Sequence, residues 1–153
     1  MITAVEKGEL CKMNTYKHKV QYYETDMMKI VHHSNYIRWF EEARIEVLDA
    51  AGISYASMED NGIMIPVLSA EAEYKMPCVF GETVLIDVNI VKYNGVKLCV
   101  EYEIWNEDRT ELRTSGKTSH CFVDSDFKLI SLKKKCPEID EAFRSMVDSA
   151  PEQ

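Results

Sequence analysis

One stretch constrains the fold of this chain most: a loop with an acid and two histidines that runs directly into the longest amphipathic helix. The loop covers residues 23–34, and the helix is expected from about Asn35 to Ala51. Large apolar residues recur along one side of this helix at helical spacing, so that side must be buried. We therefore expect the helix to pack against a β-sheet built by the later part of the chain.

Alternation of polar and apolar residues predicts one strand before the helix and four after it. The first strand is Tyr16–Tyr22, and Asn94-Gly95 is the strongest short signal in the chain for a hairpin between two later strands. The later strands are expected at residues 63–74, 83–91, 96–105 and 111–124. This order predicts an α+β fold in which a curved antiparallel sheet of about five strands wraps a long central helix. Because such a sheet has open edges, we expect a homodimer or a homotetramer.

Length and composition fit a single domain. The chain has 153 residues, of which 46% are hydrophobic and 29% are charged, and neither a repeat nor a linker divides it. We expect one domain over residues 1–153, with a core over about 16–125 and a C-terminal helix over about 137–149. Pro137 suits the first turn of that helix, where its missing N–H is not needed.

Charge and cysteine usage exclude several classes of protein. A net charge of −8 argues against nucleic-acid binding, which needs a basic face. No apolar run approaches the roughly 20 residues needed to cross a membrane, and the first residues do not resemble a signal peptide. The five cysteines show no C-x-x-C spacing, so we expect neither a disulfide framework nor a zinc site. These features predict a cytoplasmic protein without nucleic-acid or membrane partners.

The loop carries groups that suit chemistry at a carbonyl. Asp26 is either an ordinary turn residue or, beside Met27 and Met28, a partly desolvated carboxylate that acts as a base or nucleophile. His33 lies at the helix start, where a backbone N–H without an intrahelical acceptor can stabilise an oxyanion. These parts fit acyl transfer or hydrolysis. His32 and His33 are alternatively a metal pair, but no third ligand is evident, so we expect no metal or cofactor.

The same stretch resembles a known family. Its motif is Thr25-Asp26-x-x-x-Ile30-Val31-His32-His33-Ser34-Asn35-Tyr36, followed by Trp39-Phe40-Glu41-x-Ala43-Arg44. It is similar to the hotdog-fold acyl-CoA thioesterases of the 4-hydroxybenzoyl-CoA thioesterase type, in their YbgC-like branch. The resemblance covers about residues 16–125. It implies a hotdog fold and an acyl-CoA substrate, with acyl carrier protein as an alternative carrier.

The resemblance also implies roles for residues. Asp26 would attack the thioester carbonyl or activate water, while the His33 backbone N–H supports the carbonyl oxygen and its imidazole joins the site. Lys29 occupies a position where the family usually has glycine. If that position needs a positive φ, lysine is strained there by about 1–2 kcal/mol.

Family resemblance points to the hairpin and the last strand as the place where the CoA phosphates bind. Lys92, Lys97 and Lys117 are the cations available there, although each is also explained as a solvated surface lysine. Glu41 is a second candidate acid, because some hotdog enzymes carry their acid on the helix. Its alternative role is an exposed pair with Arg44.

The leading hypothesis is therefore a thioester hydrolase with Asp26 and His33 as catalytic residues. Two alternatives remain open at this point: a hotdog enoyl-thioester hydratase or dehydratase, and a non-catalytic acyl-CoA-binding protein. The second alternative is suggested by Lys29, which departs from the family pattern in the middle of the loop.

Overall fold

The computed structural model describes residues 14–148, which divide into two compact units. The first unit comprises the described residues up to Val47 together with 72–88 and 102–116, and the second comprises 48–71, 89–101 and the residues from 117 onward. Most strands run from one unit into the other. Residues 1–13 of the expected domain and residue 149, the last residue of the expected C-terminal helix, lie outside the described residues.

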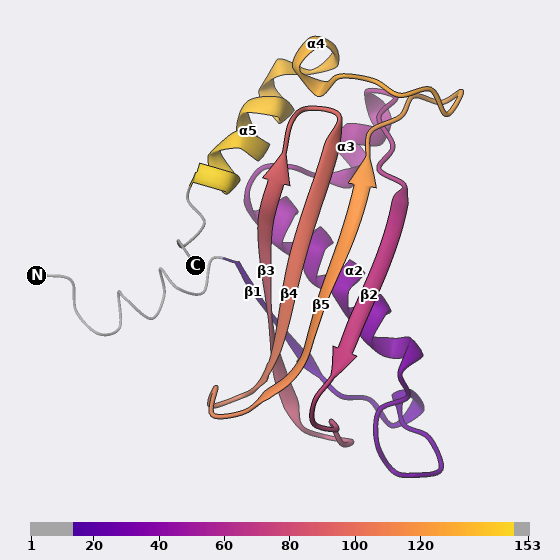
Figure 1. Cartoon of the computed structure of the whole chain (residues 1–153), viewed down its shortest axis with the longest axis vertical. Coiled ribbons are helices and arrows are strands. Elements are labelled where there is room, and N and C mark those ends of the chain that lie inside the picture. Colours follow the sequence, from indigo (N-terminus) through magenta and orange to yellow (C-terminus); the bar gives the residue numbers. More distant parts are fainter. Residues whose placement is uncertain (1–13, 149–153) are drawn as a thin grey trace, which may run out of the picture. The chain divides into compact units, whose positions relative to one another are not determined.

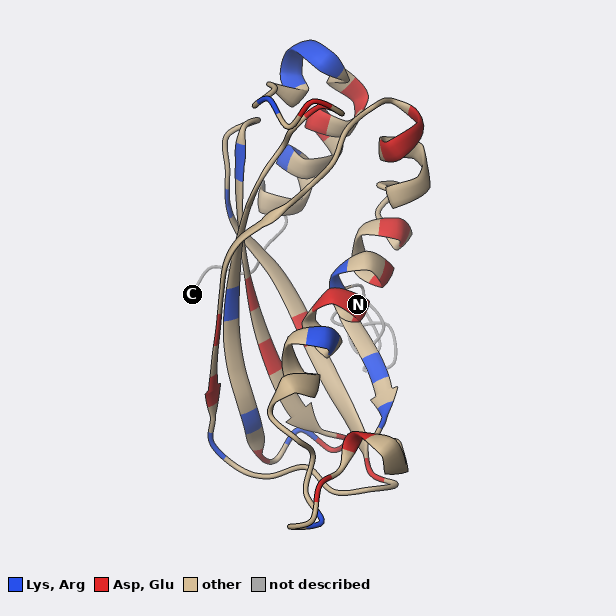
Figure 2. Ribbon diagram, turned by 90° about the vertical axis from the view of Figure 1, so that its right-hand side faces the viewer, with Lys and Arg blue, Asp and Glu red and all other residues tan. Residues whose placement is uncertain are grey.

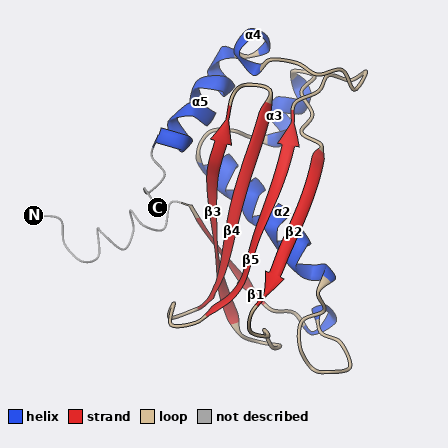
Figure 3. Ribbon diagram, in the orientation of Figure 1, coloured by secondary structure: helices blue, strands red, loops and turns tan. Residues whose placement is uncertain are grey.

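Five strands form one antiparallel sheet in the order β1-β3-β4-β5-β2 (Figures 1 and 3). The strands are β1 (Thr15–Lys19), β2 (Val67–Tyr74), β3 (Thr83–Tyr93), β4 (Lys97–Asn106) and β5 (Leu112–Cys121). The helices are α2 (Ser34–Ala50), α3 (Tyr55–Asp60), α4 (Leu132–Lys135) and α5 (Pro137–Asp148), and a 3-10 turn, η1, covers Tyr22–Glu24. The predicted α+β class is confirmed.

In the first unit, the apolar side of α2 is buried as its periodicity predicts. Trp39 and Phe40 are fully buried, and the Phe40 ring stacks on Tyr102 of β4 with 4.4 Å between ring centroids. Arg44 is buried too and donates a hydrogen bond to Tyr102 Oη at 2.9 Å. The prediction of an exposed pair between Glu41 and Arg44 is therefore wrong, because the guanidinium is directed at a buried hydroxyl.

In the second unit, α5 contributes to an aromatic cluster. The rings of Tyr93, Phe122 and Phe143 lie 5.1–6.0 Å apart, measured between centroids. Asp140 of α5 accepts hydrogen bonds from Tyr93 Oη at 2.6 Å and from Arg144 Nε at 2.9 Å. These contacts attach α5 to the end of β3.

The hairpin predicted at Asn94-Gly95 is present between β3 and β4. Gly95 has φ +89°, and the Asn94 side-chain oxygen accepts hydrogen bonds from the N–H groups of Val96 and Lys97 at 3.0 and 2.8 Å. Gly95 O also accepts from Leu132 N at 2.8 Å. Gly52, just after the end of α2, has a φ of +86°, the left-handed conformation that often ends a helix.

Several strand boundaries differ from the prediction. The first strand ends at Lys19 and not at Tyr22, which lies in η1 and is 76% exposed. β2 begins at Val67, directly after Pro66, because proline has no N–H to donate to a neighbouring strand.

Two short helices were not expected. α4 contains Lys133, Lys134 and Lys135, and these exposed lysines give the continuous blue helix in Figure 2. α3 starts at a cap in which Ser54 Oγ accepts a hydrogen bond from Ser57 N at 2.9 Å. Among residues 14–148, no helix combines the length and the apolarity that crossing a bilayer demands.

Candidate active site

The loop between η1 and α2 is closed by its own backbone. Asp26 N donates to Ile30 O at 2.9 Å, and Lys29 N donates to Asp26 O at the same distance. Thr25 and Val31 form an isolated antiparallel bridge across the loop. Lys29 has φ +66°, which is the left-handed conformation. Because Lys29 does have a positive φ, lysine is held there at a cost of about 1–2 kcal/mol.

Asp26 is half-buried, and one of its oxygens is fixed by the loop. Its Oδ1 accepts a hydrogen bond from Met28 N at 2.8 Å. Met27 and Met28 were expected to desolvate the carboxylate, but they are 101% and 71% exposed. The partial burial of Asp26 therefore does not come from the packing of these methionines.

A cavity of about 320 Å³ in the first unit brings Asp26 and His33 to one place. Its other walls are mostly apolar or aromatic. The lining residues are Asp26, Met28, Ile30, Val31, His33, Tyr36, Tyr74, Lys75, Met76 and Pro77. Asp26 supplies the one carboxylate among these residues, and Lys75 supplies the one ammonium group.

His33 lies immediately before α2 with its imidazole exposed. Tyr74 Oη donates a hydrogen bond to His33 O at 3.3 Å, and the two rings are 6.5 Å apart between centroids. Within residues 14–148, no group accepts a hydrogen bond from His33 N. A backbone N–H of this kind at a helix start is suited to an incoming oxyanion.

The imidazole of His32 caps the start of α2. Ser34 N donates to His32 Nδ1 at 3.2 Å, and Ser34 Oγ lies 2.8 Å from the same nitrogen. Ser34 itself is the first residue of the helix. The two histidine rings lie 4.2 Å apart between centroids. His32 thus supports the site locally, which its sequence position alone did not indicate.

Two weakly acidic groups of this region remain protonated. Burial raises the pKa of the Tyr36 hydroxyl above its usual value, and burial raises the pKa of the Cys78 thiol to about 11. Cys78 borders the loop, because its O accepts a hydrogen bond from Val31 N at 2.9 Å. Both groups are therefore uncharged at neutral pH, and Asp26 is the one carboxyl group among the lining residues of the cavity.

The remaining predicted residues lie outside the cavity lining. Glu41 is exposed on α2 in the first unit. Lys92, Lys97 and Lys117 belong to the second unit, on the neighbouring strands β3, β4 and β5, and all three are exposed. Figure 2 shows the basic residues of the strands as separate blue bands.

The sequence did not identify the residues at and just after the end of β2 as part of the site. Tyr74 ends that strand, and Lys75, Met76 and Pro77 continue from it into the cavity wall. The N–H groups of Lys75 and Met76 both donate to Arg113 O, at 2.9 and 3.1 Å, which fixes this segment. The only sequence signal was a run of large side chains before a proline.

The chain is similar to a known protein family and to proteins of two bacteria. A model described as the thioesterase-like superfamily matches residues 20–147. A Bacillus subtilis (strain 168) relative, YneP, is named as a proposed acyl-CoA thioesterase and is 37% identical over 126 residues, 82% of this chain and 91% of that protein. A proposed esterase from Aquifex aeolicus (strain VF5) is 36% identical over 124 residues, 81% of this chain and 94% of that protein.

A solved structure gives the same picture for the fold. The structure described as a DHNA-CoA thioesterase from Staphylococcus aureus superposes with a TM-score of 0.82 at 35% identity, covering 86% of this chain and 89% of that one. The family match extends from the start of the loop region into α5, and with these relatives it shows that the chain belongs to the thioesterase-like superfamily and has the hotdog fold.

Proposed function

We propose that this protein hydrolyses acyl-CoA thioesters to the free acid and CoA, with Asp26 as nucleophile or general base. The observation that carries the proposal is the single cavity that Asp26 and His33 line together with apolar and aromatic side chains. The named activities of the relatives support thioester hydrolysis over the hydratase alternative and over simple binding. Lys29 does not change this preference, because the loop keeps a regular hydrogen-bonded form around it.

Two routes satisfy the chemistry of hydrolysis. In the first, Asp26 takes a proton from a water molecule whose oxygen attacks the carbonyl carbon; the C–S bond breaks, and the thiolate leaves and is protonated. In the second, an Asp26 oxygen attacks, the thiolate leaves, and water then cleaves the mixed anhydride. In both routes the His33 N–H stabilises the oxyanion. Transfer of ¹⁸O from labelled water into the Asp26 carboxylate would identify the anhydride route.

Asp26→Asn tests the proposal, because it keeps the shape of the side chain but removes the base or nucleophile. We expect kcat on an acyl-CoA to fall by about a thousandfold or more. Asp49→Asn, at an exposed carboxylate of α2, is the matched control and should leave kcat unchanged. Full thiol release by the folded Asp26→Asn variant would contradict the proposal, and an enoyl-hydration assay on the same samples tests the hydratase alternative.

The carrier and the acyl group are further parts of the proposal. We assign Lys92, Lys97 and Lys117 to binding of the CoA phosphates, which predicts that replacing them with alanine raises KM for acyl-CoA in a salt-dependent way. Comparing acyl-CoA with acyl carrier protein thioesters tests the carrier. A panel of alkyl and aryl acyl-CoAs then defines the acyl preference.

We also propose that the protein is a cytoplasmic homodimer or homotetramer. β2 is the last strand in the sheet order, and all but one of its residues are exposed. The described cysteines, Cys78, Cys99, Cys121 and Cys136, are free thiols, which suits a reducing compartment. Sedimentation of a monomer at micromolar concentration would contradict the proposed assembly.

A further inference from the structure

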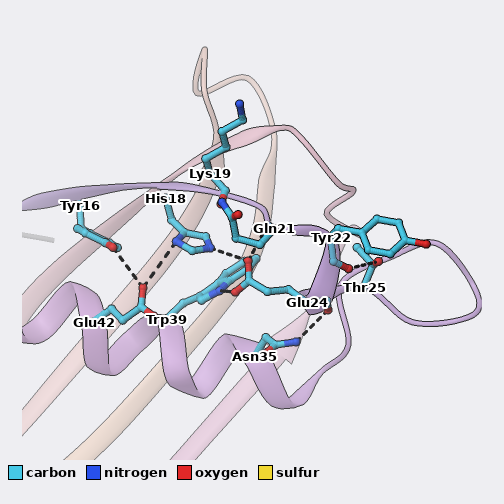
Figure 4. A network of polar contacts seen from close by, with 10 residues as sticks. All are labelled: Tyr16, His18, Lys19, Gln21, Tyr22, Glu24, Thr25, Asn35, Trp39 and Glu42. Carbon is cyan, nitrogen blue, oxygen red and sulfur yellow. Dashed lines mark hydrogen bonds and ion pairs between the residues drawn. The ribbon is translucent and has the colours of Figure 1, made fainter.

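The carboxylate of Glu24, two residues before Asp26, is buried and accepts hydrogen bonds from several elements of the first unit (Figure 4). Gln21 N donates to Glu24 Oε1 at 2.8 Å, and Trp39 Nε1 of α2 donates to Oε2. His18 Nε2 of β1 lies 2.8 Å from Oε1. Strand, turn and helix therefore meet at one side chain.

The backbone of Glu24 is tied to the start of α2 as well. Glu24 O accepts hydrogen bonds from His32 N at 2.8 Å and from the buried Asn35 side chain at 2.9 Å. These bonds join the two ends of the loop that contains Asp26. One residue thus links β1, both ends of the loop and the first turn of α2.

Glu24 is ionised within this arrangement. Burial acts to raise its pKa, but hydrogen bonds from Gln21 N, Trp39 and His18 outweigh burial and hold the pKa of the carboxyl below its usual range. Beyond His18 lies Glu42, whose Oε2 is 3.6 Å from His18 Nδ1 and accepts a hydrogen bond from Tyr16 Oη at 3.2 Å. A carboxylate can accept hydrogen bonds at both oxygens, and each oxygen of Glu24 has a donor.

Stability of the fold alone does not require a buried, ionised carboxylate at Glu24. Buried charged groups are often replaced by apolar residues of similar volume at no loss of stability. An apolar side chain makes no directional hydrogen bonds. It would therefore not fix the orientation of the turn that leads to Asp26. Glu24 is also absent from the cavity lining, so it does not itself touch a substrate held there.

We propose that Glu24 is a positioning residue for the reaction, which holds the Asp26 carboxylate and the His33 N–H in one geometry through its bonds to β1, α2 and the loop ends. This inference rests on the proposed role of Asp26. Reactions of this kind are sensitive to alignment, and a shift of about 1 Å at a reacting group costs about a hundredfold in rate.

Glu24→Gln is the first test, because it keeps the size of the side chain but replaces one acceptor oxygen with an NH₂ group that cannot accept from Trp39 or Gln21. We expect kcat to fall by about 10- to 100-fold with KM changed by less than about threefold. Trp39→Phe removes one of the donors and should give a smaller fall in the same direction. Glu46→Gln, at an exposed carboxylate of α2, is the control and should keep kcat within about twofold.

All rates are measured on protein shown to be folded by near-UV circular dichroism, well below the melting temperature of each variant. If Glu24→Gln does not fold, Trp39→Phe carries the same test. An unchanged kcat in the folded variant would overturn the inference. So would a fall in kcat that disappears when the rate is corrected for the folded fraction.

A double variant separates positioning from a general structural effect. If Glu24 acts through Asp26, adding Glu24→Gln to Asp26→Asn lowers the residual rate no further, measured with enzyme in excess over acyl-CoA. Multiplicative losses would overturn the inference. If Asp26→Asn alone stays fully active, the proposed function fails; if it is inactive while Glu24→Gln is normal, only the role of Glu24 fails.

Discussion

Two buried carboxylates, Glu24 in the first unit and Asp140 in the second, are held in the same way in very different surroundings. Glu24 and Asp140 are only 4% and 5% exposed. In both, burial acts to raise the pKa, but hydrogen bonds outweigh it and hold the pKa below the usual value. Asp140 lies within a helix beside packed aromatic rings, whereas Glu24 precedes a loop that borders a cavity.

The two buried carboxylates have different roles because their donors come from different surroundings. A buried charge costs several kcal/mol unless donors surround it, so both sites need the bonds they have. Around Asp140 the donors are Tyr93 and Arg144, which complete a filled cluster. Around Glu24 the donors come from separate elements and fix a segment that local packing does not hold, since Met27 and Met28 are exposed. We therefore expect substitution of Asp140 to change mainly the stability of the protein, and substitution of Glu24 to change mainly the rate of the reaction.

The largest effect on stability is expected from Phe143→Ala in the aromatic cluster of the second unit. Phe143 is fully buried, and removing such a ring costs about 3–5 kcal/mol of unfolding free energy. Urea denaturation measures that loss. The folded fraction should retain normal kcat, and a large fall in kcat would show that the cluster also controls the reaction.

Asp140→Asn should lower the unfolding free energy by about 1–3 kcal/mol, which is less than the loss expected for Phe143→Ala. It weakens the hydrogen bonds to Tyr93 and Arg144 but does not open a cavity. Its kcat should stay within about twofold of the parent, in contrast to Glu24→Gln. Asp60→Asn, at an exposed carboxylate of α3, is the control for stability. Equal losses of rate in Asp140→Asn and Glu24→Gln would erase the distinction between the two sites.

The pH dependence of stability follows from the same carboxylates. Their pKa values in the folded protein lie below the unfolded values of about 4, so the folded state favours the ionised form. The stabilisation is present above the unfolded pKa and is lost as the pH falls through the folded pKa. Unfolding free energies measured between about pH 6 and 3 should decline on the acid side, and less steeply in Glu24→Gln than in the parent.

The smallest effect is expected at Lys29. Lys29→Gly relieves the left-handed backbone conformation and should stabilise the protein by about 0.5–1 kcal/mol, after the larger entropy of an unfolded glycine is counted. Phe127→Gly in the second unit is a matched comparison, because Phe127 has φ +60° and is 74% exposed. Thermal unfolding measures both variants. We expect kcat to change only in Lys29→Gly, since that residue lies in the loop.

Sequence alone determined most of the local structure. Apolar spacing predicted α2 to within one residue at each end, and Asn94-Gly95 predicted the hairpin that joins β3 to β4. The motif placed Asp26 and His33 in one loop, at the entry to α2. These features depend on residues close together in the chain, where spacing and backbone preference act directly.

Which side chains from distant parts of the sequence come into contact depends on the tertiary structure. His18 was predicted merely as a strand residue, and nothing local showed that its imidazole contacts Glu24 or that Trp39 donates to the same carboxylate. Tyr74 and Lys75 join the cavity because β2 and the loop come together in the first unit. Alternation along a strand predicts which face of the sheet a side chain lies on, but it does not predict which residue that side chain contacts. That partner is set by strand order and by the burial of α2, which bring residues far apart in sequence within hydrogen-bonding distance.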